Sequence, residues 1–515
     1  MDKARLKSQR NWPEGTVGFA AYTSGLFLAA AMLPATALDP SAQFFLAGIG
    51  VLAMWRYSWG MINFVRSIIY RTYIFPRWRY QADIGGAALL PSKLYILMTI
   101  YRINPRIASR AIKAATQEAI RSGIPTTIVA SIVEQQDDEL VTTLFQSCNP
   151  PEHINLKIIR AAGTGKRVGL AHGFMTISRD RPPPDALVVV MDGDTVLLNG
   201  ALNKCIPFFK LRPKLGAVTT DEISEVDTNS PWMRNWYELR FAQRHILMSS
   251  ISLSRRVMTL TGRMSIFRAD IVTARGFIDH ITHDMLDHWR LGKFKFLTGD
   301  DKSSLYWVIK QGYEQIYIPD VQVLTLEDPP HESFLKSSTQ LMFRWFGNMF
   351  RTNSRILNLG MTRMPPFVWW AFFDQRLSMW TTLVGPIFAT LLAIKYGLIF
   401  FAYYFVWVGF VRWVMSLMLL SARPKINWRY PFLLYYSQIY GAMMKTWVFF
   451  RLDVQSWTRQ KTKLQRGLTQ SQYLWNFWSS HAVHATAIII LICSIGLASH
   501  VIQIPYAAVN SVVFH

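Results

Sequence analysis

The sequence is short of cysteine, and this shortage limits what the protein can be. Its 515 residues hold three scattered cysteines that share no metal-binding spacing, Cys148, Cys205 and Cys493. This scarcity argues against a disulfide framework or a zinc site and indicates a cytosolic main domain. Internal repeats, low-complexity tracts and a cleavable signal peptide are also missing, and the first apolar run is predicted to be a membrane anchor instead.

Acidic residues are scarce outside one window of the chain. Of the 32 acids, 27 lie between Asp83 and Glu332, so the flanking segments carry Lys and Arg with few counter-charges. The positive-inside rule and attraction to anionic lipid account for such a pattern. Alternatively, some of these cations guide a polyanionic product. We expect no nucleic-acid partner.

Long apolar runs predict five membrane spans. Arg56 lies inside the second run, where a charge is costly in lipid, so it is expected to face other helices or a wet channel. A sixth run, Tyr430–Phe450, holds two polar residues and precedes a cluster of cations, which favours an interfacial or re-entrant helix over a sixth span. The five predicted spans are Thr16–Leu38, Ala42–Phe64, Leu377–Ile394, Leu398–Leu420 and Val483–Ile504.

The segment between the spans, from about Gln81 to Pro330, alternates β-branched runs with helical stretches. Thr126–Val133, Leu187–Met191 and the run around Ile316–Ile318 are predicted to be buried strands, which indicates an α/β domain. Ligands bind at the carboxyl ends of strands in such domains. The basic, acid-free continuation to Leu359 is typical of an amphipathic helix on a membrane surface.

Asp192-Gly193-Asp194 directly follows the predicted strand Leu187–Met191. Two carboxylates on one strand-end loop are oxygen ligands that suit Mg²⁺ or Mn²⁺. A cation there would stabilise the charge on a departing nucleoside diphosphate. The pair is therefore predicted to bind a metal and the donor nucleotide.

Two further motifs supply a cation and a base. Gly163-Thr164-Gly165-Lys166-Arg167 lacks the Walker spacing, and either Lys166 or Arg167 is expected near the nucleotide unless the segment is an ordinary surface turn. Gly299-Asp300-Asp301 offers paired acids, which raise each other's pKa, and Asp301 is predicted to be the base. The alternative for this pair is a helix N-cap.

Arg344-Trp345 combines a guanidinium with an indole face that suits a sugar ring, although an interfacial Trp beside a lipid-facing Arg has the same composition. A second cluster matches no zinc signature and is interpreted as a solvated helix face. Its members are His280, His283, Asp284, Asp287 and His288.

From Thr126 to Gly467 the chain resembles processive family-2 glycosyltransferases, such as cellulose and hyaluronan synthases. The resemblance implies a GT-A-like α/β domain inserted between transmembrane and interfacial helices, with Mg²⁺ or Mn²⁺ as cofactor. Asp192 and Asp194 match the metal and diphosphate acids, and Asp301 matches the catalytic base. Asp300 stands beside that base.

The resemblance also implies acceptor and gating residues. Arg344 and Trp345 match the end of the family's Q-x-x-R-W motif, although Leu341 stands at the Gln position and Gln340 precedes it. Trp457-Thr458-Arg459 resembles the gating loop. The family's nucleotide-binding Asp-Asp-Gly-Ser motif is missing. The acidic stretch that begins at Glu134 lies near its expected position, so Glu134 is a candidate for donor binding.

The segments Leu260–Arg268 and Arg344–Met349 are most similar in sequence to the catalytic subunit of bacterial alginate synthase. This implies polymerisation of mannuronic acid from GDP-mannuronate and a separate regulatory or export subunit that binds cyclic di-GMP. It also implies acceptor binding by Arg263. The expected location is the bacterial inner membrane, with the catalytic domain in the cytoplasm.

The sequence is accordingly divided into four segments: an N-terminal transmembrane hairpin (1–80), a catalytic domain (81–331), interfacial helices (332–376) and a C-terminal transmembrane region (377–515) with a gating-like segment (451–467). The function expected is a processive β-glycosyltransferase that exports its polyanionic product across the bilayer. The alternatives are a hyaluronan-like or glucan synthase using a UDP-sugar, a non-processive transferase acting on a lipid carrier, and a transport or scaffold protein.

Overall fold

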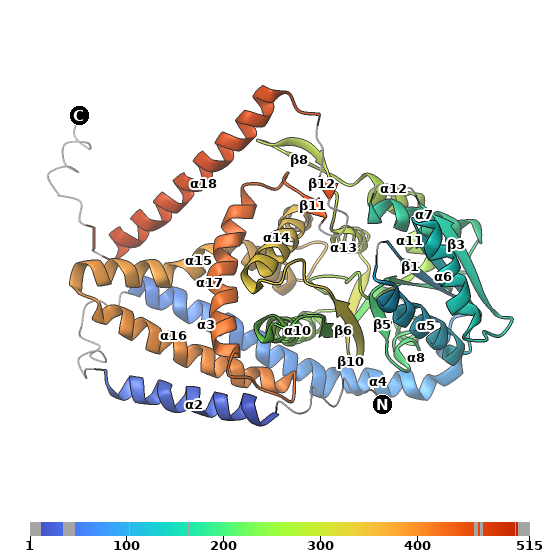
Figure 1. Cartoon of the computed structure of the whole chain (residues 1–515), viewed down its shortest axis with the longest axis horizontal. Helices are drawn as coiled ribbons and strands as arrows, with labels where there is room; N and C mark the ends of the chain where they lie inside the picture. Colours follow the sequence, from blue (N-terminus) through green and yellow to red (C-terminus); the bar gives the residue numbers. More distant parts are fainter. Residues whose placement is uncertain are drawn as a thin grey trace. The chain divides into compact units, whose positions relative to one another are not determined.

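The computed structural model describes residues 12–33, 47–101, 103–161, 165–457, 462–463, 467–499 and 501–502. The chain forms two compact units, which Figure 1 traces in sequence colours. The sheet unit comprises Asn63–Phe373 and Leu452–Gly467. The helical unit comprises Met1–Ile62, Asp374–Arg451 and Leu468–His515.

An eight-stranded mixed sheet forms the centre of the sheet unit, in the order β3-β2-β1-β4-β7-β6-β10-β5. Strands β1 to β4 run parallel to their neighbours among themselves, β10 is parallel to β6, and β7 and β5 are antiparallel. The α/β class and the three strands predicted from sequence are confirmed. The bounds are β1 Leu94–Thr99, β2 Thr126–Ile132, β3 Ile154–Arg160, β4 Leu187–Asp192, β5 Thr195–Leu197, β6 Leu215–Val226, β7 Ser265–Arg268 and β10 Glu314–Glu327.

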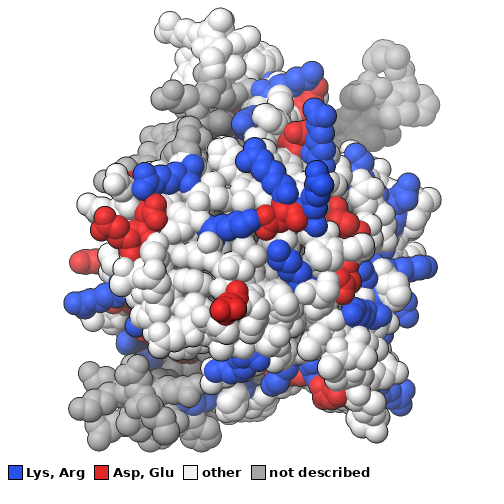
Figure 2. All heavy atoms as spheres, turned by 90° about the vertical axis from the view of Figure 1, so that its right-hand side faces the viewer, with Lys and Arg blue, Asp and Glu red and all other residues white. Residues whose placement is uncertain are grey.

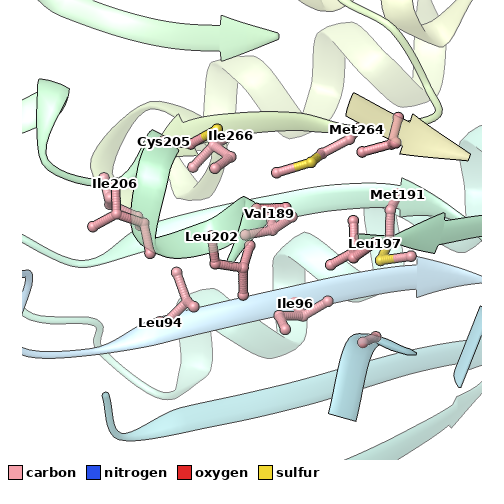
Figure 3. Packing of buried hydrophobic residues seen from close by; sticks show 14 of the residues in the cluster. Leu94, Ile96, Val189, Met191, Leu197, Leu202, Cys205, Ile206, Met264 and Ile266 are labelled. Carbon is pink, nitrogen blue, oxygen red and sulfur yellow. The ribbon is translucent and has the colours of Figure 1, made fainter. Parts of the chain in front are cut away.

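The central strands read as continuous apolar runs because both of their faces are covered. Alternate residues of a strand point to opposite faces. Ile96 of β1 joins the core cluster that includes residues of helix α5 (Pro105–Ser122), and Figure 3 shows it among side chains of neighbouring strands. Leu97 meets helix α7 (Lys166–Arg179), where a Cβ on Gly173 would lie 2.3 Å from a Leu97 methyl carbon. Burying both faces fixes the strand register.

The register aligns the carboxyl ends of three parallel strands. Thr99 at the end of β1 pairs with Ser131 of β2 and with Asp192 of β4. The first acid of the Asp-x-Asp motif therefore emerges at the sheet edge where α/β proteins bind ligands.

The other elements of the sheet unit lie around this sheet. Its exposed ion pairs include Arg160 with Asp138 at 3.0 Å, and the face drawn in Figure 2 carries both signs of charge side by side. The bounds are α4 Phe75–Gly85, α6 Gln135–Gln146, α8 Ala201–Cys205, α9 Phe208–Leu211, α10 Pro231–Ser252, α11 Ala269–Thr273, α12 Arg275–His283, α13 Asp300–Lys310, α14 Phe334–Asn358, and the two-stranded pairs β8 Met285–His288 with β9 Gly292–Lys295 and β11 Ser456–Trp457 with β12 Thr462–Lys463.

The helical unit contains α2 (Trp12–Ala31), α16 (Ile399–Met418), α17 (Tyr430–Phe449) and α18 (Gln470–Ala498), together with parts of α3 (Ala47–Ile69) and α15 (Pro366–Tyr396). Among the described residues, three helices are long and apolar enough to cross a membrane: Pro366–Tyr396, Ile399–Ser421 and Gln470–Ala498. They contain most of the last three predicted spans. A shorter apolar helix covers Gly15–Ala31 and overlaps the first part of the first predicted span.

Arg56 of α3 faces another helix of its own unit. Its guanidinium forms an ion pair with Asp374 of α15, whose side chain is 9% exposed. A cation placed among apolar helices is far less costly when a carboxylate neutralises it. This arrangement is the one expected for a charge that faces other helices.

Candidate functional site

A cavity of about 670 Å³ opens at the carboxyl ends of β1, β2 and β4. Its lining includes Thr99, Tyr101 and Ser131 near the strand ends. Charged side chains and residues of α14 complete the lining. The sequence-predicted residues that line the cavity are Lys166, Asp192, Asp194, Arg263, Asp300, Asp301, Arg344 and Trp345.

The Asp-x-Asp turn needs glycine between its acids. A Cβ on Gly193 would lie 2.7 Å from Ile103 Cδ1 and 2.9 Å from the Thr99 carbonyl oxygen. These distances are too short for a real side chain, so the turn packs against the end of β1. Asp192 and Asp194 consequently both reach the cavity.

Lys166 joins the two acidic motifs. It is the first residue of α7, and its Nζ lies 2.6 Å from Asp192 Oδ1 and 3.0 Å from Asp300 Oδ2. Gly262 leaves the space for this contact, because a Cβ there would lie 2.8 Å from Nζ. Residues far apart in sequence thus form one charged centre.

Arg167, the alternative to Lys166, points elsewhere. The residue is 3% exposed, and its guanidinium donates to the carbonyl oxygens of Ile281 and Thr298 at 3.0 and 3.1 Å and to Ser303 Oγ at 2.8 Å. Of the two adjacent cations, the cavity is lined by Lys166.

The charges of this centre shift one another's pKa. Burial raises the pKa of Asp192 to about 6, with Asp194 and Asp300 adding to the rise and Lys166 opposing it. Burial acts in the same direction on Asp300, but Lys166 and Arg167 outweigh it and hold its pKa below the usual range. For Lys166, burial lowers the pKa, and the two carboxylates more than reverse that effect. The ammonium therefore stays charged.

Asp300 and Asp301 are the first two residues of α13, and the N-cap position belongs to Gly299. No side chain caps this helix, so the N-cap interpretation of the acids is wrong. Burial and the neighbouring Asp300 raise the pKa of Asp301. The hydroxyl of Thr259 approaches Asp301 Oδ2 at 3.5 Å. A carboxylate with a raised pKa on the cavity wall suits a general base.

Trp345 of α14 is held in an aromatic stack. Its ring stacks on Trp236 with centroids 5.7 Å apart, and the Arg240 guanidinium carbon lies 3.6 Å from its centroid. Gln340 also lines the cavity, four residues before Arg344 on the same helix. Residues four apart share one face of a helix, so Gln340 lies in line with Arg344.

Arg263 lines the cavity between two carboxylates. Its Nη1 lies 3.2 Å from Glu222 Oε2, and its Nη2 donates to Glu327. Tyr237 donates to the second oxygen of Glu327 at 3.3 Å. Sequence reasoning missed Glu327 and Tyr237, because neither stands in a motif and only the fold brings them to Arg263.

The other four predicted site residues are not among the described residues that line the cavity. Glu134 is exposed at the N-cap of α6 and is not among the described residues that line the cavity, although its neighbour Val133 is. Trp457 ends strand β11. Thr458 and Arg459 lie outside the described residues.

The interpretation of the His and Asp cluster as a solvated helix face is wrong for Asp284. Helix α12 ends at His283 and β8 begins at Met285, so Asp284 and His288 are not a helical pair. Asp284 is buried, and it accepts hydrogen bonds from Ser303 and from both terminal nitrogens of Arg355. Across the described residues no set of three or more metal-ligating side chains is assembled.

Comparisons with known proteins show the family to which the chain belongs. Residues 91–348, about half of the chain, match the family model described as Glycosyltransferase like family 2. The chain is thus a family-2 glycosyltransferase.

Curated relatives place the chain more closely. It is 45% identical over 470 residues to Glycosyltransferase alg8 of Pseudomonas syringae pv. tomato, covering 91% of this chain and 95% of that protein. It is 44% identical over 481 residues to Glycosyltransferase alg8 of Azotobacter vinelandii, covering 93% and 97%. The chain belongs to the alg8 family of glycosyltransferases. The predicted family and enzyme class are confirmed, and with its three candidate spans the enzyme is membrane-associated.

Solved structures resemble the chain more distantly. A mannosyltransferase from Pyrobaculum calidifontis in complex with GDP-Man and Mn²⁺ is 16% identical, with a TM-score of 0.41 over 74% of this chain and 98% of that chain. GalNAc-T7 with UDP, GalNAc and Mn²⁺ is 8% identical, with a TM-score of 0.31 over 52% and 51%. Similarity at this level says nothing about the donor or the metal of this chain.

Proposed function

We propose that the protein is a mannuronan synthase, which transfers mannuronosyl units from GDP-mannuronate to the end of a growing β-linked polymer. The observation that carries the proposal is the cavity that joins Asp192, Asp194 and Lys166 to Asp301 and Trp345. The similarity to alginate synthase and the alg8 relatives support the sugar. Inverting transfer is typical of family 2.

The residues at the strand ends fit a divalent cation. Asp192 and Asp194 offer carboxylate oxygens on the cavity wall, and Asp300 adds negative charge nearby. Mg²⁺ and Mn²⁺ suit a pair of carboxylates, because substrate phosphates and water complete the coordination. When bound, the cation would neutralise charge on the diphosphate.

The transfer step assigns one role to each remaining residue. The acceptor hydroxyl attacks the anomeric carbon of the donor sugar while Asp301 takes its proton. The new C–O bond forms as the bond to the diphosphate oxygen breaks, and GDP leaves with the electron pair. Lys166 stabilises the departing charge. Attack on the face opposite the leaving group inverts the anomeric configuration.

Trp345 and two arginines would receive the acceptor. The indole offers a flat apolar face to the terminal sugar ring. Arg344 and Arg263 also line the cavity, and guanidinium groups pair well with carboxylates such as those of a uronate. The acceptor end therefore has the chemistry for an acidic sugar.

The predicted segments give the enzyme its setting. We place residues 81–331 in the cytoplasm and residues 1–80 and 377–515 in the bacterial inner membrane, with 332–376 at the interface and 451–467 as the gating segment. The basic flanks of the apolar helices support this orientation. The polymer would leave through the membrane helices, and a separate subunit that binds cyclic di-GMP would regulate export.

The decisive test supplies membranes containing the full chain with GDP-mannuronate and divalent cation. We expect a polymer that alginate lyase degrades, and an Asp301→Asn variant that still binds the donor but makes none. Normal turnover by Asp301→Asn would sink the base assignment. A product made only from UDP-sugars and resistant to the lyase would favour a hyaluronan-like or glucan synthase. Short lipid-extractable products would favour transfer to a lipid carrier.

A further inference from the structure

The acid loop, defined as Thr298–Asp301, rests on a side chain of α14. Asn348 Oδ1 accepts a hydrogen bond from the Thr298 hydroxyl at 2.8 Å. Gly299 has φ +86°, and a Cβ there would lie 2.9 Å from Asn348 Cγ. The loop that carries the proposed base is thus in direct contact with Asn348.

Arg351 ties Asn348 to a distant part of the chain. It lies one turn after Asn348 on α14, it is 2% exposed, and its Nη2 donates to Asn348 Oδ1. Its Nη1 donates to the carbonyl oxygen of Leu452 at 3.0 Å. A guanidinium is planar and rigid, so its two arms fix the spacing of both acceptors.

The segment Leu452–Gln455, here called the strap, is also bonded to the chain that leads into the acid loop. Gln455 is 5% exposed; its Nε2 donates to the Lys295 carbonyl at 2.9 Å, and its Oε1 accepts from the Leu297 amide at 3.0 Å. The strap is therefore linked to the acid loop by two routes. Gln455 bonds to the residues that precede the loop, and Arg351 joins Leu452 to Asn348, which bonds to Thr298.

Arg351 is buried in a cluster of three arginines around Phe296. The guanidinium carbons of Arg351, Arg167 and Arg355 lie 5.7, 5.7 and 4.8 Å from the ring centroid of Phe296. Burial and the two neighbouring arginines lower the pKa of Arg351 to about 9. Placing a charge there is costly, and two oriented hydrogen bonds offset the cost.

We propose that Arg351 is a positioning residue for the transfer step: by joining the strap to Asn348, it sets the place of the acid loop and of Asp301. The inference rests on the proposed role of Asp301 as base. Misplacing a reacting group by about 1 Å costs on the order of 10²-fold in rate. Losing these two hydrogen bonds should therefore lower kcat more than it weakens donor binding, because Asp301 moves with the loop whereas Lys166 keeps its contact with Asp192 outside it.

The test compares the wild-type full chain in membranes with Arg351→Lys. This variant keeps the positive charge but cannot donate to Asn348 and Leu452 at the same time with the geometry of a guanidinium. We expect kcat for polymer formation to fall about 10²-fold, with KM for GDP-mannuronate changed less than about threefold. Gln455→Met removes the two hydrogen bonds of Gln455 to Lys295 and Leu297. It should likewise lower kcat and leave KM nearly unchanged. Added guanidinium ion should partly restore Arg351→Ala.

Arg268→Lys is the matched control. Arg268 also donates to backbone carbonyls of the sheet unit, those of Leu215 and Phe209 at 2.7 and 2.8 Å, away from the acid loop. It should lower thermal stability without lowering kcat. An Arg351→Lys enzyme with wild-type kcat, or with losses identical to those of Arg268→Lys, would overturn the proposal. Turnover by Asp301→Asn would instead refute the proposed base.

Discussion

The cavity residues proposed to bind the donor and those proposed to bind the acceptor are held in place in different ways. At the proposed donor end, Asp192 and Lys166 form a charged centre at the ends of parallel strands, where the sheet register sets the position of Asp192. At the proposed acceptor end, Trp345 of α14 packs against Trp236 and Arg240, which both belong to α10. The donor end is held by charges that can exchange partners. At the proposed acceptor end, Trp345 is held by aromatic packing.

This difference matches the chemistry proposed for each end. A diphosphate and a cation bring large charges, so acids linked by a lysine can redistribute their partners when these arrive. A sugar ring brings a weakly polar face, which benefits from an aromatic surface already fixed in place. Substitutions should accordingly affect catalysis strongly at the donor end and acceptor retention modestly at the other.

The largest effect is expected for Asp192→Asn. This change removes a proposed metal ligand and the closest partner of Lys166, so kcat should fall about 10³-fold and Mn²⁺ should no longer bind tightly. GDP release and Mn²⁺ titration measure the two effects. Asp287→Asn is the control, because Asp287 has a side chain 70% exposed on β8. Equal losses in both variants would contradict the donor-end assignment.

Substituting the adjacent residues Lys166 and Arg167 should have different effects, on donor affinity and on stability respectively. Lys166→Gln removes a charge from the cavity, and losing a charge-assisted contact of about 1.5–3 kcal/mol should raise KM for the donor about 10- to 100-fold. Arg167→Gln should instead lower the free energy of unfolding by about 3 kcal/mol, because its partners are buried. Donor titrations and thermal unfolding of both variants test this; a reversed pattern would assign the donor to Arg167.

Most residues that line the cavity could be predicted from sequence, but the contacts that hold them in place could not. An apolar run followed by Asp192 places that acid at a strand end, since a strand buried on both faces leaves little freedom of register. The choice between Lys166 and Arg167 could not be made, because adjacent residues leave a helix in different directions. Trp236 and Asp284 had no local signal: their contacts join segments about 100 and 70 residues apart in the chain.

Lowering the pH should reduce activity by protonating Asp192 and so weakening metal binding. Asp192 has a pKa of about 6, so it is ionised above that pH and takes up a proton below it. Mn²⁺ needs the ionised form, so its affinity should fall roughly tenfold for each pH unit below 6. Raising the Mn²⁺ concentration should restore activity at pH 5.5. Asp301 also has a raised pKa, and its protonation would not be reversed by metal. An acid loss that Mn²⁺ fails to relieve would place the titration on Asp301.

The smallest effect is expected at the acceptor end, for Arg240→Gln. The guanidinium lies over the Trp345 ring, and burial lowers the pKa of Arg240 to about 9, so part of the cation–π attraction is offset by desolvation. A net loss of about 1 kcal/mol would let the indole reorient and weaken retention of the chain end about fivefold. The polymer should become shorter, as measured by gel filtration of the product, while KM for the donor stays unchanged. Trp345→Leu removes the stacking surface itself and should shorten the product further. If Arg240→Gln changed donor KM but not polymer length, the two ends would not be independent, and the packing at Trp345 would have to support the charged centre as well.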